Sequence, residues 1–300
     1  QGVIDYPAPG VPDPSKNMEE AVRVVRSLQG RYPAVEPSIF CHSPYTCSAD
    51  TLTKAKQAAR DLGVLFQIHV AETEGEKTLI PENRGLSPVA YLESLGILDD
   101  RTLLVHAVAV DRHDLEIIEK SKASVVHVPE SNMKLASGVS PVPDMLALGI
   151  SVALGTDGCA SNNDLDMFGE MGSAARLHKV IRKDPTVMDA KTVLRMATLG
   201  GARALGLGDV TGSLEPGKKA DLIVVDMRKP HLTPMYNAPS HLVYSAKGSD
   251  VRDVMVDGRM VVENRRLLTL DLESVMNQVA AFSRQVHRRP QDFEDLKGDL

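Results

Sequence analysis

The chain contains no tryptophan, and aromatic residues make up only 4% of its 300 residues. So few aromatic rings argue against a surface on which nucleic-acid bases stack. Lysine and arginine together number 34 against 40 acidic residues, which gives a formal net charge of -6, and the two signs are mixed along the sequence. The chain therefore lacks the basic stripe of nucleic-acid-binding proteins and the polybasic segment of membrane-surface proteins.

Long apolar segments and paired cysteines are missing too. No apolar run approaches the roughly 18 residues of a membrane-spanning helix, and no signal-peptide pattern opens the sequence. The three cysteines, Cys41, Cys47 and Cys159, form no CxxC pair and no disulfide framework. We therefore expect a cytoplasmic protein with no membrane partner.

Three common catalytic signatures are absent: GxGxxG, the Walker loop and GxSxG. This chain therefore lacks the key residues of a doubly wound nucleotide-binding sheet and of a serine hydrolase. The chain is nevertheless 43% hydrophobic, which is enough for a sizeable core. These properties favour an enzyme that acts on a small molecule.

Short apolar runs alternate with amphipathic helical stretches up to about Gly206. Such a repeat predicts an α/β fold with a parallel sheet, and the six strands that we expect fall short of the eight in the common closed barrel. Asn17, with Glu20 three residues later, predicts the start of the first helix at a capping box. The expected strands are the first residues of the chain, the run that ends at Cys41, Leu65–Val70, Thr102–His106, Ser124–Val128 and Ser151–Leu154.

The pattern of predicted elements changes after Gly206. Short strand-like runs with tight turns follow, and the tetrapeptide Val256–Arg259 is typical of a β-hairpin. We therefore predict a small β module here. A closing helix is expected at Leu272–Val286, followed by a polar tail.

Metal-binding residue types follow three of the predicted strands. His69 ends one apolar run and Glu72 comes three residues later, His106 ends the next run, and Asp157 lies just after SVALGT. Barrel enzymes place their chemistry at the carboxyl ends of parallel strands. Imidazole and carboxylate groups suit zinc, iron or manganese, so this edge of the sheet predicts one divalent metal, with zinc as the first choice.

Each of these residues also has an ordinary interpretation. A strand-end histidine is often structural, and Asp157 between glycines could cap a turn. His106 could be a metal ligand or an orienting group, and His42 a substrate contact or a turn residue. Five further histidines are interpreted as surface or core residues: His113, His178, His231, His241 and His287.

Several motifs taken together resemble the amidohydrolase superfamily. They are HVAE, LLVHA, PESNMKLASG, ALGTDGCASNNDLDMFGEM and GSLEPGKKADLIVVD, and they most resemble 5-methylthioadenosine/S-adenosylhomocysteine deaminases and related chlorohydrolases. The resemblance implies a distorted (β/α)8 TIM-like barrel, of which strands three to eight are present, and a small β-sandwich. It assigns residues 1–208 to the barrel, 209–270 to the C-terminal half of the sandwich and 271–300 to a helix and tail.

The resemblance also implies a hydrolytic deamination in which metal-bound hydroxide attacks an adenosine-type nucleoside and ammonia leaves. His69 and Asp157 would be metal ligands, and Asp157 would accept the proton of the water. Glu72 would protonate the ring nitrogen, and His106 would orient the hydroxide. A possible homo-oligomer is implied as well.

Substrate contacts are implied for His42, Glu72 and Ser161. The loop before the first helix holds no arginine, and the first one, Arg23, falls inside the helix. The loop offers Gln1, Lys16 and Asn17, whereas family members can hold the carboxylate of the homocysteine adduct with arginines there, so methylthioadenosine or adenosine is expected in preference to that adduct. The alternative substrate is another amino-heterocycle, such as an s-triazine or a guanine derivative.

One departure from the family pattern concerns the metal. Family members carry an HxH pair on the first barrel strand, and this sequence has no HxH. We therefore expect a fragment of a longer enzyme, metal-poor and inactive by itself, because His69 and Asp157 fall short of the three protein ligands usual for catalytic zinc. A metal-free binding protein on a decayed barrel is the competing interpretation.

Overall fold

The computed structural model describes residues 2–8, 11, 13–80 and 85–287. It forms two compact units, Gln1–Lys219 with Met227–Gly248, and Ala220–Asp226 with Ser249–Leu300. Each unit is thus formed by two separate segments of the chain. The predicted tail at 288–300 lies outside the described residues. Among the described helices, none combines the length and apolar character that a membrane span requires.

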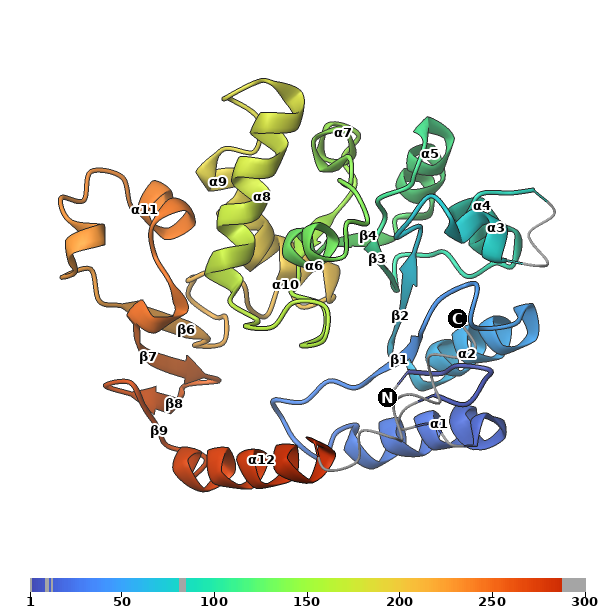
Figure 1. The fold of residues 1–300 in the computed structure, drawn as a ribbon, viewed down its shortest axis with the longest axis horizontal. Helices are drawn as coiled ribbons and strands as arrows, with labels where there is room; N and C mark the ends of the chain where they lie inside the picture. Colours follow the sequence, from blue (N-terminus) through green and yellow to red (C-terminus); the bar gives the residue numbers. More distant parts are fainter. Residues whose placement is uncertain (1, 9–10, 12, 81–84, 288–300) are drawn as a thin grey trace. The chain divides into compact units, whose positions relative to one another are not determined.

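The first unit is built on one parallel sheet (Figure 1). Each strand is hydrogen-bonded to the next in chain order, so the α/β prediction is confirmed. The strand predicted at the start of the chain is wrong, because Val3 makes only an isolated parallel bridge to Cys41. Within the described residues the sheet is open, with five strands: β1 (Ser38–Cys41), β2 (Leu65–Val70), β3 (Thr102–His106), β4 (Ser124–His127) and β5 (Val152–Leu154).

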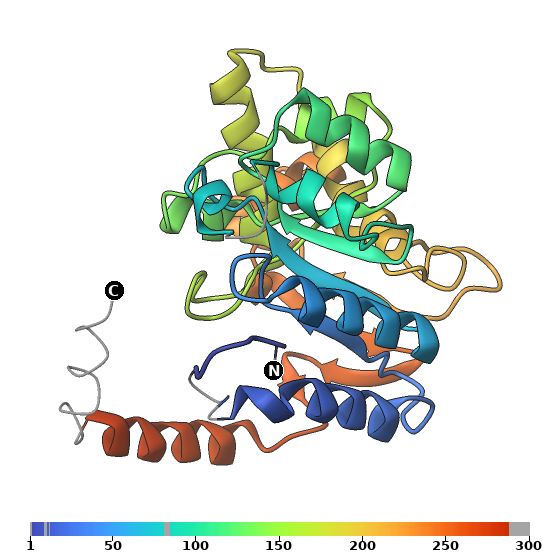
Figure 2. The same ribbon diagram turned by 90° about the vertical axis from the view of Figure 1, so that its right-hand side faces the viewer.

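Helices follow the strands, and they cover the sheet as the apolar runs predicted. All five residues of β3 are buried, as expected for a strand with packing on both faces. Figure 2 shows α2 lying along β1 and β2. The helices of this unit are α1 (Asn17–Leu28), α2 (Ala49–Leu62), α3 (Glu76–Leu79), α4 (Pro88–Ser94), α5 (Arg112–Ser121), α6 (Pro129–Lys134), α7 (Val142–Ala147), α8 (Met167–Arg182), α9 (Ala190–Arg195), α10 (Gly201–Ala204) and α11 (Ala238–Tyr244), with 3-10 turns η1 (Pro14–Lys16) and η3 (Pro230–Leu232) and the π-helical turn η2 (Met196–Gly200).

Asn17 does not cap the first helix, which corrects the prediction of a capping box. The turn η1 runs directly into α1, and Asn17 is buried inside the helix. Its side-chain amide donates to the carbonyl oxygens of Gly2 at 3.1 Å and Ile4 at 3.3 Å. Asn17 therefore fastens the start of the chain, and Glu20 pairs with Arg23 instead.

The second unit contains one antiparallel sheet, in agreement with the predicted β module. Its strands are β6 (Leu222–Val225), β7 (Val251–Val256), β8 (Arg259–Glu263) and β9 (Arg266–Leu267), and helix α12 (Leu272–His287) follows. The 3-10 turn η4 (Gly248–Asp250) leads directly into β7. The predicted hairpin is confirmed, because Val256 pairs with Arg259 across a two-residue turn. Asp257 and Gly258 both have positive φ, 48° and 75°, as a type I′ turn requires.

Two histidines meet inside the first unit. The Nε2 atoms of His127, at the end of β4, and His178, on α8, lie 3.2 Å apart, and both side chains are buried. One ring must donate its proton to the lone pair of the other, so at least one of the two nitrogens is unprotonated. Burial lowers the pKa of His178 to about 4, and the charge of Arg182 contributes in the same direction.

Acid should therefore weaken the fold through His178. Its folded pKa lies below the ordinary value of 6.5, so the folded chain loses stability as pH falls from about 6.5 towards 4. In His178→Gln, which does not titrate, we expect the wild type to lose about 2 kcal/mol of unfolding free energy relative to the variant between pH 7 and pH 5. Urea unfolding at the two pH values measures this, and equal losses in both proteins would contradict it.

Candidate functional site

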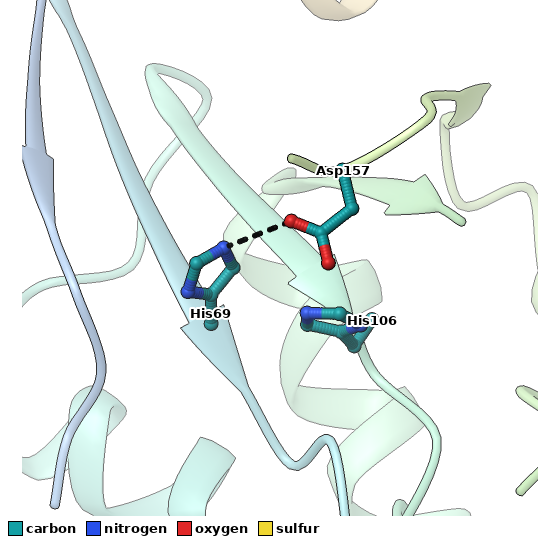
Figure 3. A group of neighbouring side chains, drawn as sticks. All are labelled: His69, His106 and Asp157. Carbon is teal, nitrogen blue, oxygen red and sulfur yellow. Dashed lines mark ion pairs between the residues drawn. The ribbon is translucent and has the colours of Figure 1, made fainter. Parts of the chain in front are cut away.

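The structure brings together three of the residues singled out in the sequence (Figure 3). His69 is the second-last residue of β2, His106 is the last of β3, and Asp157 follows β5 by three residues. Because the strands are parallel, these ends meet at one edge of the sheet. One ligand atom from each residue lies within 4.8 Å of the others. The ligand atoms of two imidazoles and one carboxylate are therefore close enough together for a single metal ion to lie among them.

Backbone turns at the strand ends make this convergence possible. Val70, not His69, pairs with His106 across the sheet, so a regular strand would place the two histidines on opposite faces. His106 instead has φ 78°, and Asp157 has φ 62°. Left-handed conformations of this kind are costly for residues other than glycine. The turn at His106 brings its ring to 5.1 Å from that of His69, measured between centroids.

Asp157 presents one oxygen to His69 and uses the other for hydrogen bonds. Its Oδ2 accepts from Ser131 Oγ at 2.7 Å and from Ser161 Oγ at 2.6 Å, while Oδ1 lies 3.8 Å from His69 Nε2. Burial has the largest effect and raises the pKa of Asp157, but the hydrogen bonds from Ser161, Ser131 and the Gly158 N–H, together with His106, outweigh it and the net shift is downward. The carboxylate is therefore ionised at neutral pH.

His69, in contrast to the ionised Asp157, is a neutral imidazole at neutral pH. Burial lowers the pKa of His69 to about 4, and the nearby His106 ring adds to the shift. The ring packs edge-on against Phe40 and His42, with centroids 5.1 and 5.4 Å away. A neutral imidazole and an ionised carboxylate are the forms in which these groups bind metal ions.

His106 is oriented by an amide that the sequence analysis did not identify. Its Nδ1 lies 2.8 Å from Asn132 Oδ1, on α6. The carbonyl oxygen accepts the Nδ1 proton, so Nε2 is left with a lone pair that faces the site. His106 Nε2 lies 3.7 Å from Glu72 Oε2, which places the fourth predicted residue beside the other three.

Glu72 is fixed through both its side chain and its backbone. Ser137 Oγ donates to Glu72 Oε1 at 3.1 Å, and the Glu72 amide donates to Glu76 Oε2 at 2.8 Å. Glu76 is buried, and burial raises its pKa to about 7. Its Oε1 has no hydrogen-bond partner within the described chain. This carboxylate therefore holds the loop after β2 in place.

The two remaining predicted residues lie beside the cluster. His42 contacts the His69 ring, and its Nδ1 lies 3.0 Å from Thr46 Oγ1, which fixes the loop after β1. Ser161 was predicted as a substrate contact. Its hydroxyl lies within hydrogen-bond distance of Asp157 Oδ2 and of the carbonyl oxygen of Gly158. The structure thus gives Ser161 a supporting contact that the sequence did not predict.

Four residues that support the site were not predicted from the sequence: Glu76, Ser131, Asn132 and Ser137. The last three lie in PESNMKLASG, directly after β4, so polar residues at a fourth strand end were a usable signal. Glu76 offered no such signal, because only the folded chain shows that its carboxylate is buried under the Glu72 loop.

The sequence model of one protein family matches most of the chain. The amidohydrolase family model matches residues 10–261. Among curated proteins, the chain is 49% identical over 287 residues to 5-methylthioadenosine/S-adenosylhomocysteine deaminase of Syntrophobacter fumaroxidans. The match covers 95% of this chain and 65% of that protein, so the chain spans slightly less than two thirds of its relative.

Solved structures give the same fold. An adenosine deaminase from Xanthomonas campestris with bound zinc is 35% identical and superposes with a TM-score of 0.90, over 95% of this chain and 65% of that one. An atrazine chlorohydrolase from Arthrobacter aurescens, in complex with zinc, has a TM-score of 0.81 at 24% identity, over 89% of this chain and 59% of that one. The second likeness concerns the fold alone.

The buried Glu76 predicts a dependence of stability on pH. Its folded pKa of about 7 lies above the ordinary 4.5, so the folded chain loses stability as pH rises through this interval. Relative to Glu76→Gln, we expect the wild type to lose about 2 to 3 kcal/mol of unfolding free energy between pH 5 and pH 8. Denaturant titrations at both pH values measure it, with the exposed Glu74→Gln as control. A constant difference between wild type and Glu76→Gln would refute the assignment.

Proposed function

The chain belongs to the amidohydrolase family, and from this membership we propose that it carries the acid–base residues and metal ligands of a hydrolytic deaminase. The proposed substrates are adenosine-type nucleosides. One observation carries the proposal: His69, His106, Glu72 and Asp157 converge at one sheet edge in a chain 49% identical to a deaminase of such nucleosides.

The family is metal-dependent, and the residues at the sheet edge fit a divalent cation. His69 is neutral, Asp157 is ionised, and an imidazole nitrogen with a carboxylate oxygen is a donor set that zinc accepts. We assign His69 and Asp157 as ligands, with zinc as the metal and iron or manganese as alternatives. The bound ion would supply Lewis acidity that lowers the pKa of a water molecule.

The chain's own residues would handle the protons. His106 Nε2 accepts a hydrogen bond from the attacking water, and Asp157 takes a proton as the oxygen bonds to C6 of the purine. Glu72 donates a proton to the adjacent ring nitrogen, which relieves the charge that develops there. Asp157 then protonates the amino group, which leaves as ammonia, and Glu72 recovers its proton from the new hydroxyl as the C6 carbonyl forms.

Substrate specificity is proposed for the rim beside the cluster. His42 lies one ring away from His69 and would contact the purine or the ribose. No arginine precedes α1, so a 5′ group without a carboxylate suits the chain best, as in methylthioadenosine or adenosine. The prediction of a homo-oligomer is retained.

The activity test offers the purified chain with added zinc a panel of methylthioadenosine, adenosine, S-adenosylhomocysteine, an s-triazine and guanine. Zinc is supplied in excess because His69 and Asp157 fall short of the three protein ligands usual for catalytic zinc, and with the metal added we expect slow, zinc-dependent ammonia release from the adenosine compounds. Glu72→Gln and Asp157→Asn should each lower kcat by about 10²- to 10⁴-fold, the usual range for a lost acid or base. His69→Ala should lower bound zinc, measured by elemental analysis, and exposed Glu74→Gln should change neither quantity.

Three results would count against the proposal. Absence of ammonia from every compound with zinc in excess would support a binding protein or an inactive fragment. Faster turnover of the triazine or guanine would favour the amino-heterocycle alternative. Unchanged kcat in Glu72→Gln would remove Glu72 from the proton transfers.

A further inference from the structure

We infer that Glu170, on α8, is a positioning residue that sets the orientation of the Asp157 carboxylate. It does so by holding the two segments whose serines donate to Asp157. The inference concerns the geometry of the site and rests on the proposed function only for its consequence for zinc. Glu170 is fully buried.

The first contact of Glu170 is to the segment after β4. Glu170 Oε2 accepts the backbone N–H of Glu130 at 3.2 Å. The next residue, Ser131, donates its hydroxyl to Asp157 Oδ2, and Asn132 after it holds His106. One backbone hydrogen bond therefore fixes the start of α6, which carries a partner for each of two site residues.

The second contact is to the loop after β5. Glu170 Oε1 accepts from the side-chain amide of Asn162 at 2.5 Å. Asn162 is itself fixed, since its backbone N–H donates to Gly158 O at 3.0 Å and its Oδ1 accepts from Leu165 N at 3.1 Å. The preceding residue, Ser161, is the second donor to Asp157 Oδ2.

The two contacts are arranged symmetrically around Asp157. Each oxygen of Glu170 binds a residue adjacent to one of the two serines, and both serines bind the same oxygen of Asp157. With Oδ2 held from two sides, Oδ1 is the oxygen that faces His69. If either serine shifted, the carboxylate could rotate and exchange its oxygens.

The packing of α8 against α6 supports this arrangement. Ser173 Oγ, also on α8, donates to Glu130 Oε1 at 2.8 Å. A Cβ atom at Gly169 would lie 3.1 Å from that same oxygen, so the glycine allows the close approach of the two helices. The N-terminal half of α8 therefore serves as a platform for the Glu130 segment.

Burying an ionisable carboxyl group such as that of Glu170 costs folding free energy, which a purely structural residue need not do. Burial raises the pKa of Glu170 to about 7, so ionising it in the folded chain is unfavourable. An apolar side chain of similar volume would fill the space without this cost. What an apolar residue cannot do is accept from two donors on two different segments.

The decisive variants exchange donor and acceptor. In Glu170→Gln one carboxylate oxygen becomes an NH2 group, which faces a donor whichever way the amide lies, so one contact is lost. We expect crystal structures to show at least one serine bond to Asp157 broken. We also expect a zinc affinity about 10- to 100-fold lower at pH 8, the usual effect of losing an outer partner of a metal site.

A charge-conserving double variant should restore both properties. In Glu170→Gln/Asn162→Asp, the new glutamine accepts from Glu130 N and donates to the new carboxylate. Asn162→Ala, which leaves the buried glutamate in place, should reproduce the loss and covers the case in which Glu170→Gln does not fold. A merely structural role would lower the melting temperature of the single variants but leave their serine bonds to Asp157 and their zinc affinity as in the wild type.

Asp114 provides the matched control. It is a buried carboxylate on α5 that also accepts one backbone N–H, from Asp111, and one side-chain hydroxyl, from Ser87. Asp114→Asn should lower the melting temperature while leaving zinc affinity and the Asp157 hydrogen bonds as in the wild type.

The inference is overturned if Glu170→Gln keeps both serine bonds to Asp157, or if Asp114→Asn weakens zinc binding equally. Failure of the proposed function looks different, because the wild type would then bind no zinc and release no ammonia. In that event the crystal structures of Glu170→Gln and the double variant still decide whether Glu170 sets the position of Asp157.

Discussion

The parallel pairing of β2, β3, β4 and β5 is the constraint on which the site depends. It brings the ends of segments far apart in the sequence to one edge, but the pleat alone would separate His69 from His106. The left-handed turn at His106 resolves this conflict at a local conformational cost. Strain at this position is therefore part of the architecture, since a relaxed strand end would turn the imidazole away from Asp157.

Polar residues that surround His69, His106 and Asp157 determine which of these three side chains is charged and where the protons lie. The hydrogen bonds to Asp157, those of the two serines among them, keep it ionised, Asn132 fixes the proton of His106 on Nδ1, and burial keeps His69 neutral. The same set of contacts places Glu76 and Glu170 where water cannot reach them, so it weakens the fold in order to hold functional loops. Proteins commonly accept such a loss of stability at sites that need fixed polar groups.

Most of the fold could be predicted because its signals are local. Apolar runs marked β2 to β5, and a two-residue turn with glycine marked the β7–β8 hairpin. The errors arose where tertiary contacts decided the outcome. The first residues form isolated bridges instead of a strand, with Val3 paired to Cys41 and Ala8 to Val11, and Asn17 binds distant carbonyls instead of capping its helix. The supporting contacts of the site were invisible for the same reason, since Glu76 and Glu170 acquire partners only on folding.

His127 shows why a strand-end position is not sufficient to identify a site residue. It ends β4 just as His106 ends β3, and its ring lies 5.1 Å from that of His178, the same separation as between His69 and His106. His127 is fully buried, and in the part of the chain that the structure describes it joins no cluster of potential metal ligands. Among the residues that the structure describes, no ion pair joins the interior pair to a carboxylate, whereas the edge pair faces Asp157 and Glu72. The neighbouring carboxylate, more than the histidine, therefore distinguishes a chemical site from a packed core.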